Sequence, residues 1–169
     1  MSETLQPALP DDLDEQAERL MRRLCDKGLT IATAESCTGG MLAALLTDIE
    51  GAGHAFERGF VTYTKEAKSE LLGIDRNLLD HNDAVSETVA RAMAEGALAR
   101  STADLALGVT GFAGPAGDNR EEGLVHFALA RRGLDTVHRE EHFGPIGRGP
   151  VRVKSLEVML KMVEEAIED

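Results

Sequence analysis

The stretch ESCTGG, from Glu35 to Gly40, places hydroxyl, thiol and glycine residues between two apolar runs, LTIATA and MLAALL. These runs predict a short strand followed directly by a buried helix. A helix N-terminus offers unpaired backbone N–H groups and the positive end of the helix dipole, so a hydroxyl held there would lie beside an oxyanion site. Ser36 or Thr38 could also serve as an ordinary helix cap, with Gly39 and Gly40 allowing close packing. The two interpretations are compatible.

A second pair of chemically active residues is Tyr63 with Lys68, in VTYTKEAKSELLG. Tyr63 closes a predicted strand and Lys68 lies about one turn into a predicted helix, so the two side chains could converge near the strand end. The alternative is that the tyrosine packs and the lysine is solvated, as such residues usually are. Four residues separate the pair and no G-x-G-x-x-G follows the first strand, which excludes the pattern of short-chain dehydrogenases.

A glycine-rich stretch, VTGFAGPAGD, follows the apolar run ADLALG. Its three glycines around Pro115 predict a turn-rich loop that leaves another strand at the same end of the sheet. Thr110 and Gly111 would then face the ESCTGG loop. The glycine-rich loop could also be purely connective.

The histidines argue against a metal centre. His138 and His142 are four residues apart, which on a strand keeps them on one face but too far apart to share one ion. We therefore expect solvated surface histidines and no metal ligands.

These residues must be positioned by alternating helices and strands. The apolar pattern predicts helices over 13–27, 41–49, 65–72, 87–100 and 151–169, and strands over 29–34, 56–64, 103–110, 123–130 and 135–143. The alternation predicts an α/β sandwich, and the adjacent fourth and fifth strands favour a hairpin, hence a mixed, mostly parallel sheet. Residues 1–12 are predicted to be a flexible leader before a single domain over 13–169.

Composition limits the partners of this domain. With 18 Lys and Arg against 30 Asp and Glu, the net charge of −12 argues against nucleic-acid binding. The apolar runs are far shorter than the ~20 residues of a membrane span, and the acidic N-terminus does not resemble a secretory signal. We therefore expect a cytoplasmic protein that binds no membrane, with Cys25 and Cys37 as reduced thiols.

Four motifs occur in order: ESCTGGMLAALLTDIEGAG, GFVTYTKEAKSELLGI, AVSETVARAMAEGA and LALGVTGFAGPAG. From about Leu13 to the C-terminus the chain resembles the CinA C-terminal domain family, which includes the PncC-type nicotinamide-nucleotide amidohydrolases. The resemblance implies a three-layer α/β/α domain that hydrolyses the carboxamide of nicotinamide mononucleotide to nicotinic acid mononucleotide and ammonia, without metal or cofactor.

The resemblance also bears on partners and on domain content. Together with the small-residue helix over 86–100, it favours a homo-oligomer. In full-length CinA proteins a larger N-terminal domain, associated with ADP-ribose pyrophosphatase activity, precedes this one. A chain of 169 residues leaves no room for that domain, so we expect this second activity to be absent.

Residue by residue, the resemblance places the family's serine at Ser36, its tyrosine at Tyr63, its lysine at Lys68 and the threonine of its V-T-G-x-A-G-P motif at Thr110. This set looks like a serine nucleophile with a lysine base, assisted by tyrosine. Such chemistry is possible because a desolvated lysine can have a pKa low enough to accept the serine proton. Lys68 or Tyr63 would then protonate the departing ammonia.

The substrate would be held by further groups. Backbone N–H groups around Thr38–Gly40, or from the turn at Thr110 and Gly111, would stabilise the oxyanion. Arg148 and Arg152 are candidates for the substrate phosphate, because a guanidinium suits bidentate phosphate contact. The segment GPIGRGPVR replaces the family's G-D-R element here, and DNREEGLV is shorter and more acidic than the usual loop.

Two alternatives stay open. Cys37 could be the nucleophile, with Glu35 and Lys68 as partners in a nitrilase-like amidase, although buried cysteines are more often inert. Alternatively the chain could be a nucleotide-binding or regulatory module of the same fold, associated with competence or damage responses, that performs no turnover.

Overall fold

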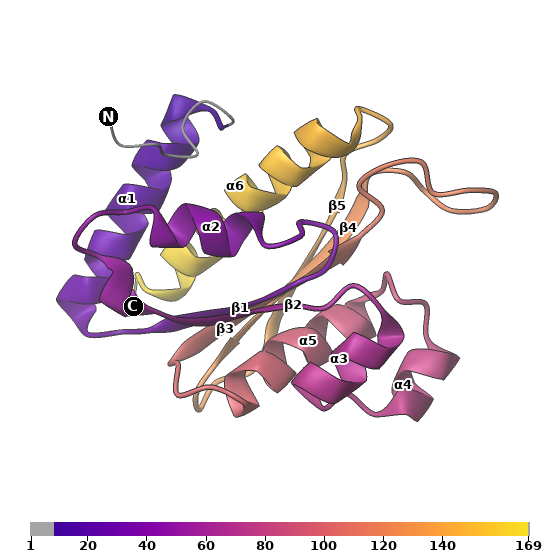
Figure 1. The fold of residues 1–169 in the computed structure, drawn as a ribbon, viewed down its shortest axis with the longest axis horizontal. Coiled ribbons are helices and arrows are strands. Elements are labelled where there is room, and N and C mark those ends of the chain that lie inside the picture. The colour runs from indigo at the N-terminus through magenta and orange to yellow at the C-terminus, as the bar shows by residue number, and fades with distance from the viewer. Residues whose placement is uncertain (1–8, 169) are drawn as a thin grey trace.

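The computed structural model describes residues 9–168, which form one five-stranded sheet between two layers of helices (Figure 1). The strands are β1 (Ile31–Glu35), β2 (Phe56–Val61), β3 (Leu105–Gly111), β4 (Leu124–Arg131) and β5 (Val137–His142). The helices are α1 (Asp11–Lys27), α2 (Met41–Thr47), α3 (Lys65–Leu72), α4 (Arg76–His81), α5 (Glu87–Ala99) and α6 (Arg148–Ala166), with a 3₁₀ turn over Gly53–Ala55. The expected α/β/α sandwich is confirmed.

The sheet has the strand order β2-β1-β3-β4-β5. β1 pairs in parallel with β2 and β3, whereas β4 is antiparallel to both β3 and β5. Four strands therefore run in one direction and β4 alone runs against them, so the prediction of a mixed, mostly parallel sheet with a hairpin is confirmed.

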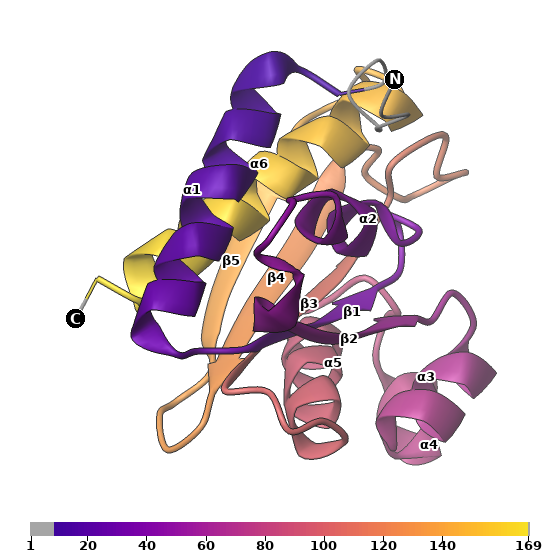
Figure 2. The same cartoon turned by 60° about the vertical axis from the view of Figure 1, so that its left-hand side comes forward.

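Helices α1, α2 and α6 cover one face of the sheet, and α3, α4 and α5 cover the other (Figure 1). On the first face α1 and α6 lie side by side (Figure 2), joined by a hydrogen bond from Gln16 to Glu164. On the second face α5 packs directly on the backbone of β3, because a Cβ at Gly108 would lie 2.7 Å from the carbonyl oxygen of Ala90. The small-residue face predicted for this helix thus serves close packing on the sheet.

Element ends differ in three places that matter for the site. α1 begins at Asp11, two residues before the predicted start, while residues 1–8 of the expected leader lie outside the described residues. β2 ends at Val61, so Tyr63 lies in the following loop and does not close the strand. α6 begins at Arg148, three residues early, and α4 was not predicted at all.

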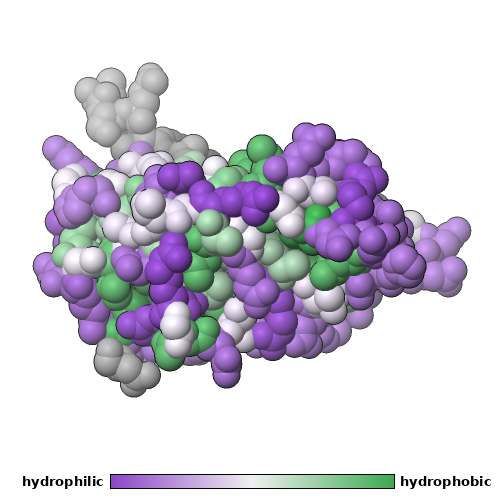
Figure 3. Space-filling view, turned by 90° about the horizontal axis from the view of Figure 1, so that it is seen from below, coloured by the Kyte–Doolittle hydropathy of each residue, from purple (hydrophilic) through white to green (hydrophobic). Residues whose placement is uncertain are grey.

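The surface formed by α3, α4 and α5 is largely hydrophilic with small apolar areas, and hydrophilic residues cover the end that carries the loop between β3 and β4 (Figure 3). Among the residues that the structure describes, no helix is both long and apolar enough to cross a bilayer.

Candidate active site

Ser36 lies at the carboxyl end of β1, between two other strand ends. Because β1 pairs in parallel register with β2 and β3, Thr62, Ser36 and Thr110 lie side by side across the sheet. The backbone N–H of Ser36 donates to the carbonyl oxygen of Val109 at 3.2 Å. Ser36 alternates with Ala34, which packs against α5, so its hydroxyl lies on the α3 and α5 face. The ESCTGG and VTGFAGPAG segments therefore meet at the carboxyl ends of the adjacent parallel strands β1 and β3.

Lys68 reaches Ser36 from the first turn of α3. Its Nζ donates to Ser36 Oγ at 3.0 Å, to the carbonyl oxygen of Thr62 at 2.9 Å and to that of Tyr63 at 3.4 Å. Thr64 caps the helix by accepting from the N–H of Ala67 at 3.1 Å, which fixes where α3 begins. The short loop between β2 and α3 thus positions Lys68 relative to Ser36 and provides two of the carbonyl oxygens that accept its hydrogen bonds.

Burial favours the neutral form of Lys68. The side chain is 2% exposed, and loss of hydration lowers its pKa from 10.5 to about 8. Within residues 9–168 no carboxylate forms an ion pair with it. In the neutral amine, two N–H bonds can go to the Thr62 and Tyr63 carbonyls, which leaves the nitrogen lone pair directed at the Ser36 hydroxyl.

Glu35 holds the segment that follows Ser36. Its Oε2 accepts from Thr38 Oγ1 at 2.6 Å, from the N–H of Gly40 at 3.2 Å and from that of Leu42 at 3.0 Å, while Oε1 accepts from the N–H of Ala43 at 2.8 Å. The carboxylate is 1% exposed and carries the N-terminus of α2. A negative charge is favourable at this end of a helix.

Two of the backbone N–H groups expected to stabilise the oxyanion, those of Gly39 and Gly40, already have acceptors in the protein. The N–H of Gly39 donates to the carbonyl oxygen of Ser36 and that of Gly40 to Glu35, so neither is free for a substrate. Within the described chain, the N–H groups of Cys37 and Thr38 donate to no backbone or side-chain oxygen. The N–H of the residue after a nucleophile is a common oxyanion donor.

Cys37 is a poor nucleophile in this structure. It is 5% exposed and packs in the core beneath α1, α2 and α6. Burial raises the pKa of its thiol to about 12, so the thiolate that a cysteine amidase needs is strongly disfavoured. Glu35, proposed as its partner, is fully used in capping α2.

Three other predicted site residues take positions that their sequence pattern did not reveal. The Tyr63 side chain is 68% exposed, and the residue meets Lys68 through its carbonyl oxygen. Thr110 is buried and its hydroxyl donates to the carbonyl oxygen of Ala84 at 2.7 Å, which ties β3 to the loop before α5. At Gly111 a Cβ would lie 2.7 Å from Val125, so glycine permits the close approach of β3 and β4.

Arg148 and Arg152 lie one helical turn apart at the start of α6, and each contacts one of the two glycine-containing loops. Nε of Arg152 donates to the carbonyl oxygen of Cys37 at 2.8 Å, and its guanidinium lies against Gly39. The guanidinium of Arg148 lies against Gly114, where a Cβ would be 2.7 Å from Nη2. Two cations and a helix N-terminus therefore border the loops around Ser36, in a chain whose net charge is −12.

The capping role of Glu35 was missed from the sequence, where this residue lies six positions before the predicted helix start at Met41. Among residues 9–168, one group of three side chains of the types that can bind a metal ion lies outside this site. It consists of His126, His138 and Glu140, on β4 and β5.

The model of the CinA C-terminal domain matches residues 13–167. The nicotinamide-nucleotide amidohydrolase PncC of Escherichia coli K12 is 43% identical over 134 residues, which are 78% of this chain and 81% of that protein. A CinA-like protein of Akkermansia muciniphila is 52% identical over 115 residues, 67% of this chain. This chain spans only 28% of the length of that relative.

A solved structure shows the same fold. The competence/damage inducible protein CihA from Agrobacterium tumefaciens superposes with a TM-score of 0.90 at 42% sequence identity, over 95% of this chain and 98% of that one.

Proposed function

The chain belongs to the CinA C-terminal domain family, and we propose that it is an amidohydrolase that converts nicotinamide mononucleotide to nicotinic acid mononucleotide and ammonia. The observation that carries this proposal is the 3.0 Å contact between Lys68 Nζ and Ser36 Oγ, made by a buried lysine whose pKa is lowered to about 8. The PncC relative at 43% identity, named for this activity, supports the substrate.

The first step is acylation of Ser36. Lys68 accepts the hydroxyl proton while Ser36 Oγ attacks the carboxamide carbon, and the N–H groups of Cys37 and Thr38 would hold the developing oxyanion. At pH 7 roughly a tenth of a lysine with pKa 8 is neutral, which is enough for a general base. The proton on Lys68 then passes to the amide nitrogen, and ammonia leaves.

The second step is hydrolysis of the acyl-enzyme. Lys68, neutral again, takes a proton from water, and the hydroxide formed attacks the ester carbon to release the acid and restore Ser36. Arg148 and Arg152 would hold the phosphate, since both guanidinium groups border the loops around Ser36. The exposed ring of Tyr63 would cover the substrate. Self-association and a cytoplasmic location stay predictions.

The test is release of ammonia and nicotinic acid mononucleotide by the purified full chain. We expect turnover by the wild type, a loss of roughly 10³-fold or more in Ser36→Ala, and retention in Cys37→Ala. Loss in Cys37→Ala with retention in Ser36→Ala would instead establish the thiol as nucleophile. Binding of the mononucleotide without turnover by the wild type would favour the regulatory-module alternative.

A further inference from the structure

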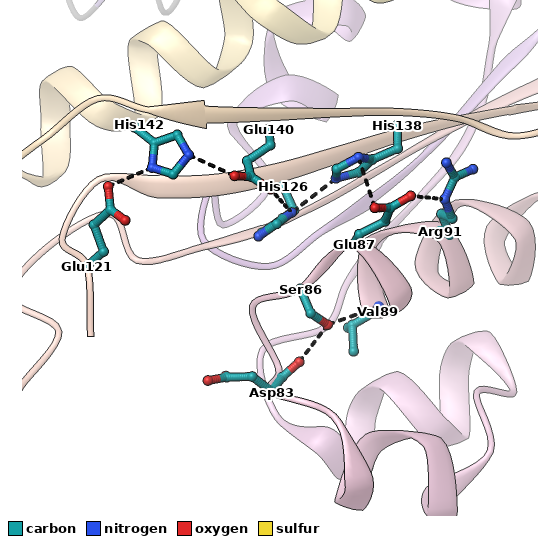
Figure 4. A network of polar contacts seen from close by, with 10 residues as sticks. All are labelled: Asp83, Ser86, Glu87, Val89, Arg91, Glu121, His126, His138, Glu140 and His142. Atoms are coloured by element: carbon teal, nitrogen blue, oxygen red, sulfur yellow. Dashed lines mark hydrogen bonds and ion pairs between the residues drawn. The ribbon is translucent and has the colours of Figure 1, made fainter. Parts of the chain in front are cut away.

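A second polar cluster lies on the same face of the sheet as Ser36, towards its other edge. The sheet register pairs His126 of β4 with Glu140 of β5. His138 lies two residues before Glu140 on β5, so its side chain is on the same face. His126 is also the register partner of Thr110, which lies beside Ser36. Figure 4 shows the two imidazoles and the carboxylate close together on the side of the strands that faces Glu87 and Arg91.

The three side chains are spaced as metal ligands. His126 Nδ1 lies 3.0 Å from His138 Nε2 and 3.6 Å from Glu140 Oε2, and one ligand atom from each residue lies within 4.8 Å of the others. Two ligand atoms bound at zinc–nitrogen distances to a tetrahedral ion are about 3.3 Å apart. The two distances from His126 Nδ1, 3.0 Å and 3.6 Å, lie on either side of that value.

Further groups lie on the outer side of two of the three ligands, His138 and Glu140. Glu87 Oε2 lies 3.6 Å from His138 Nδ1, and Glu87 Oε1 accepts a hydrogen bond from Arg91 Nε at 2.7 Å. Glu140 Oε1 contacts His142 Nε2 at 2.7 Å (Figure 4). Metal-bound histidines usually have a carboxylate or carbonyl at the second ring nitrogen, which fixes the tautomer and the ring orientation. Glu87 stands where that partner is needed.

Burial and charge also suit a cation. His126 is 7% exposed and His138 is only slightly more accessible, whereas Glu140 is open to solvent, so an ion could enter from one side. Two carboxylates lie beside the imidazoles, Glu140 near His126 and Glu87 near His138. The alternative to an ion is a hydrogen bond between the two facing nitrogens, which are 3.0 Å apart, with one imidazole as the donor.

We propose that His126 Nδ1, His138 Nε2 and Glu140 bind one divalent first-row transition-metal ion, such as Zn²⁺, which joins β4 to the edge strand β5. Two imidazoles and a carboxylate are a ligand set that such ions prefer. Three protein ligands leave a coordination position for water or a small anion. Glu87 orients His138 and so couples the ion to the first turn of α5.

The experiment uses the full chain, stripped with a chelator and then titrated with Zn²⁺ against a chromophoric indicator. We expect one equivalent to bind and, at a free Zn²⁺ concentration of 100 times Kd, a rise in Tm of about 5–10 °C. Co²⁺ in place of Zn²⁺ should give visible absorption bands, which report a bound ion directly and do not depend on activity.

Variants locate the ion. His138→Ala and the size-matched Glu140→Gln should each weaken Zn²⁺ binding at least tenfold, and Glu87→Gln should weaken it by about tenfold. His54→Ala is the control, because His54 is an exposed histidine distant in sequence from the cluster. Failure of the wild type to bind one equivalent, or an equal loss in the His54 variant, would show that the two imidazoles only share a hydrogen bond.

Discussion

Glu35 and Lys68 are two buried charges in contact with the same short segment, and they are treated in opposite ways. Glu35 accepts hydrogen bonds from three backbone N–H groups and a threonine hydroxyl. Lys68, 2% exposed, meets two carbonyl oxygens and the Ser36 hydroxyl, and no carboxylate within residues 9–168 forms an ion pair with it. A buried charge with all its partners supports the structure, whereas a desolvated one is ready to change its protonation state.

The largest expected effect comes from removing the desolvated charge. Lys68→Met keeps the length of the side chain but removes the base, so kcat should fall by about 10²–10⁴-fold. The free energy of unfolding, measured in urea, should be unchanged or raised, because an uncompensated buried cation costs stability. A large loss of stability in this variant would show that Lys68 is structural like Glu35.

The converse substitution should act on stability. Glu35→Ala leaves the N-terminus of α2 uncapped and a buried hydroxyl without its acceptor, so the free energy of unfolding should fall by roughly 2–4 kcal/mol. Glu35→Gln should lose less, because one acceptor oxygen remains. Glu50→Ala, an exposed acid just beyond the same helix, is the control in the same urea titration. Equal stability of the Glu35 and Glu50 variants would contradict the capping role.

Substitution of Arg148 and Arg152, on α6, tests whether these residues bind the phosphate of the substrate. Arg148→Ala and Arg152→Ala should each raise KM for the mononucleotide by about 10–100-fold, the value of one charge-assisted hydrogen bond to phosphate. The dephosphorylated nucleoside should show no such increase, since it has no group for them to bind. Lys154→Ala, an exposed cation on the same helix, controls for net charge. An equal change in KM for the mononucleotide and the nucleoside would contradict the proposed contact between these arginines and the phosphate.

The sequence was sufficient for elements whose signals are local. Periodicity located the five strands, the start of α5 at Glu87 and the end of α1 at Lys27, all confirmed. The convergence of Lys68 on the strand end could be expected from one helical turn of spacing. The contact between Lys68 and the Tyr63 carbonyl oxygen could not be expected, since it depends on β2 ending at Val61, three residues before the predicted end.

Contacts across strands were beyond the sequence. His138 was compared with His142, its neighbour in the chain, whereas its partner in space is His126 on β4. That contact depends on the register of the β4 and β5 hairpin, which no spacing in the sequence encodes. Glu35 was similarly missed because its acceptor role extends eight residues along the chain, to Ala43.

The smallest expected effect is the pH dependence of activity and stability, which tests whether Lys68 is the group that titrates. With a pKa of about 8, Lys68 is protonated and inactive as a base below that pH, so kcat/KM should rise about tenfold from pH 7 to pH 9 and then level. The same shift acts on stability: between about pH 8 and 10.5 the unfolded chain holds a proton that the folded chain has lost, so stability rises with pH in that window. Wild type should show this rise relative to Lys68→Met. If both proteins have the same stability profile while the kinetic profile still rises, the group that titrates in catalysis is not Lys68.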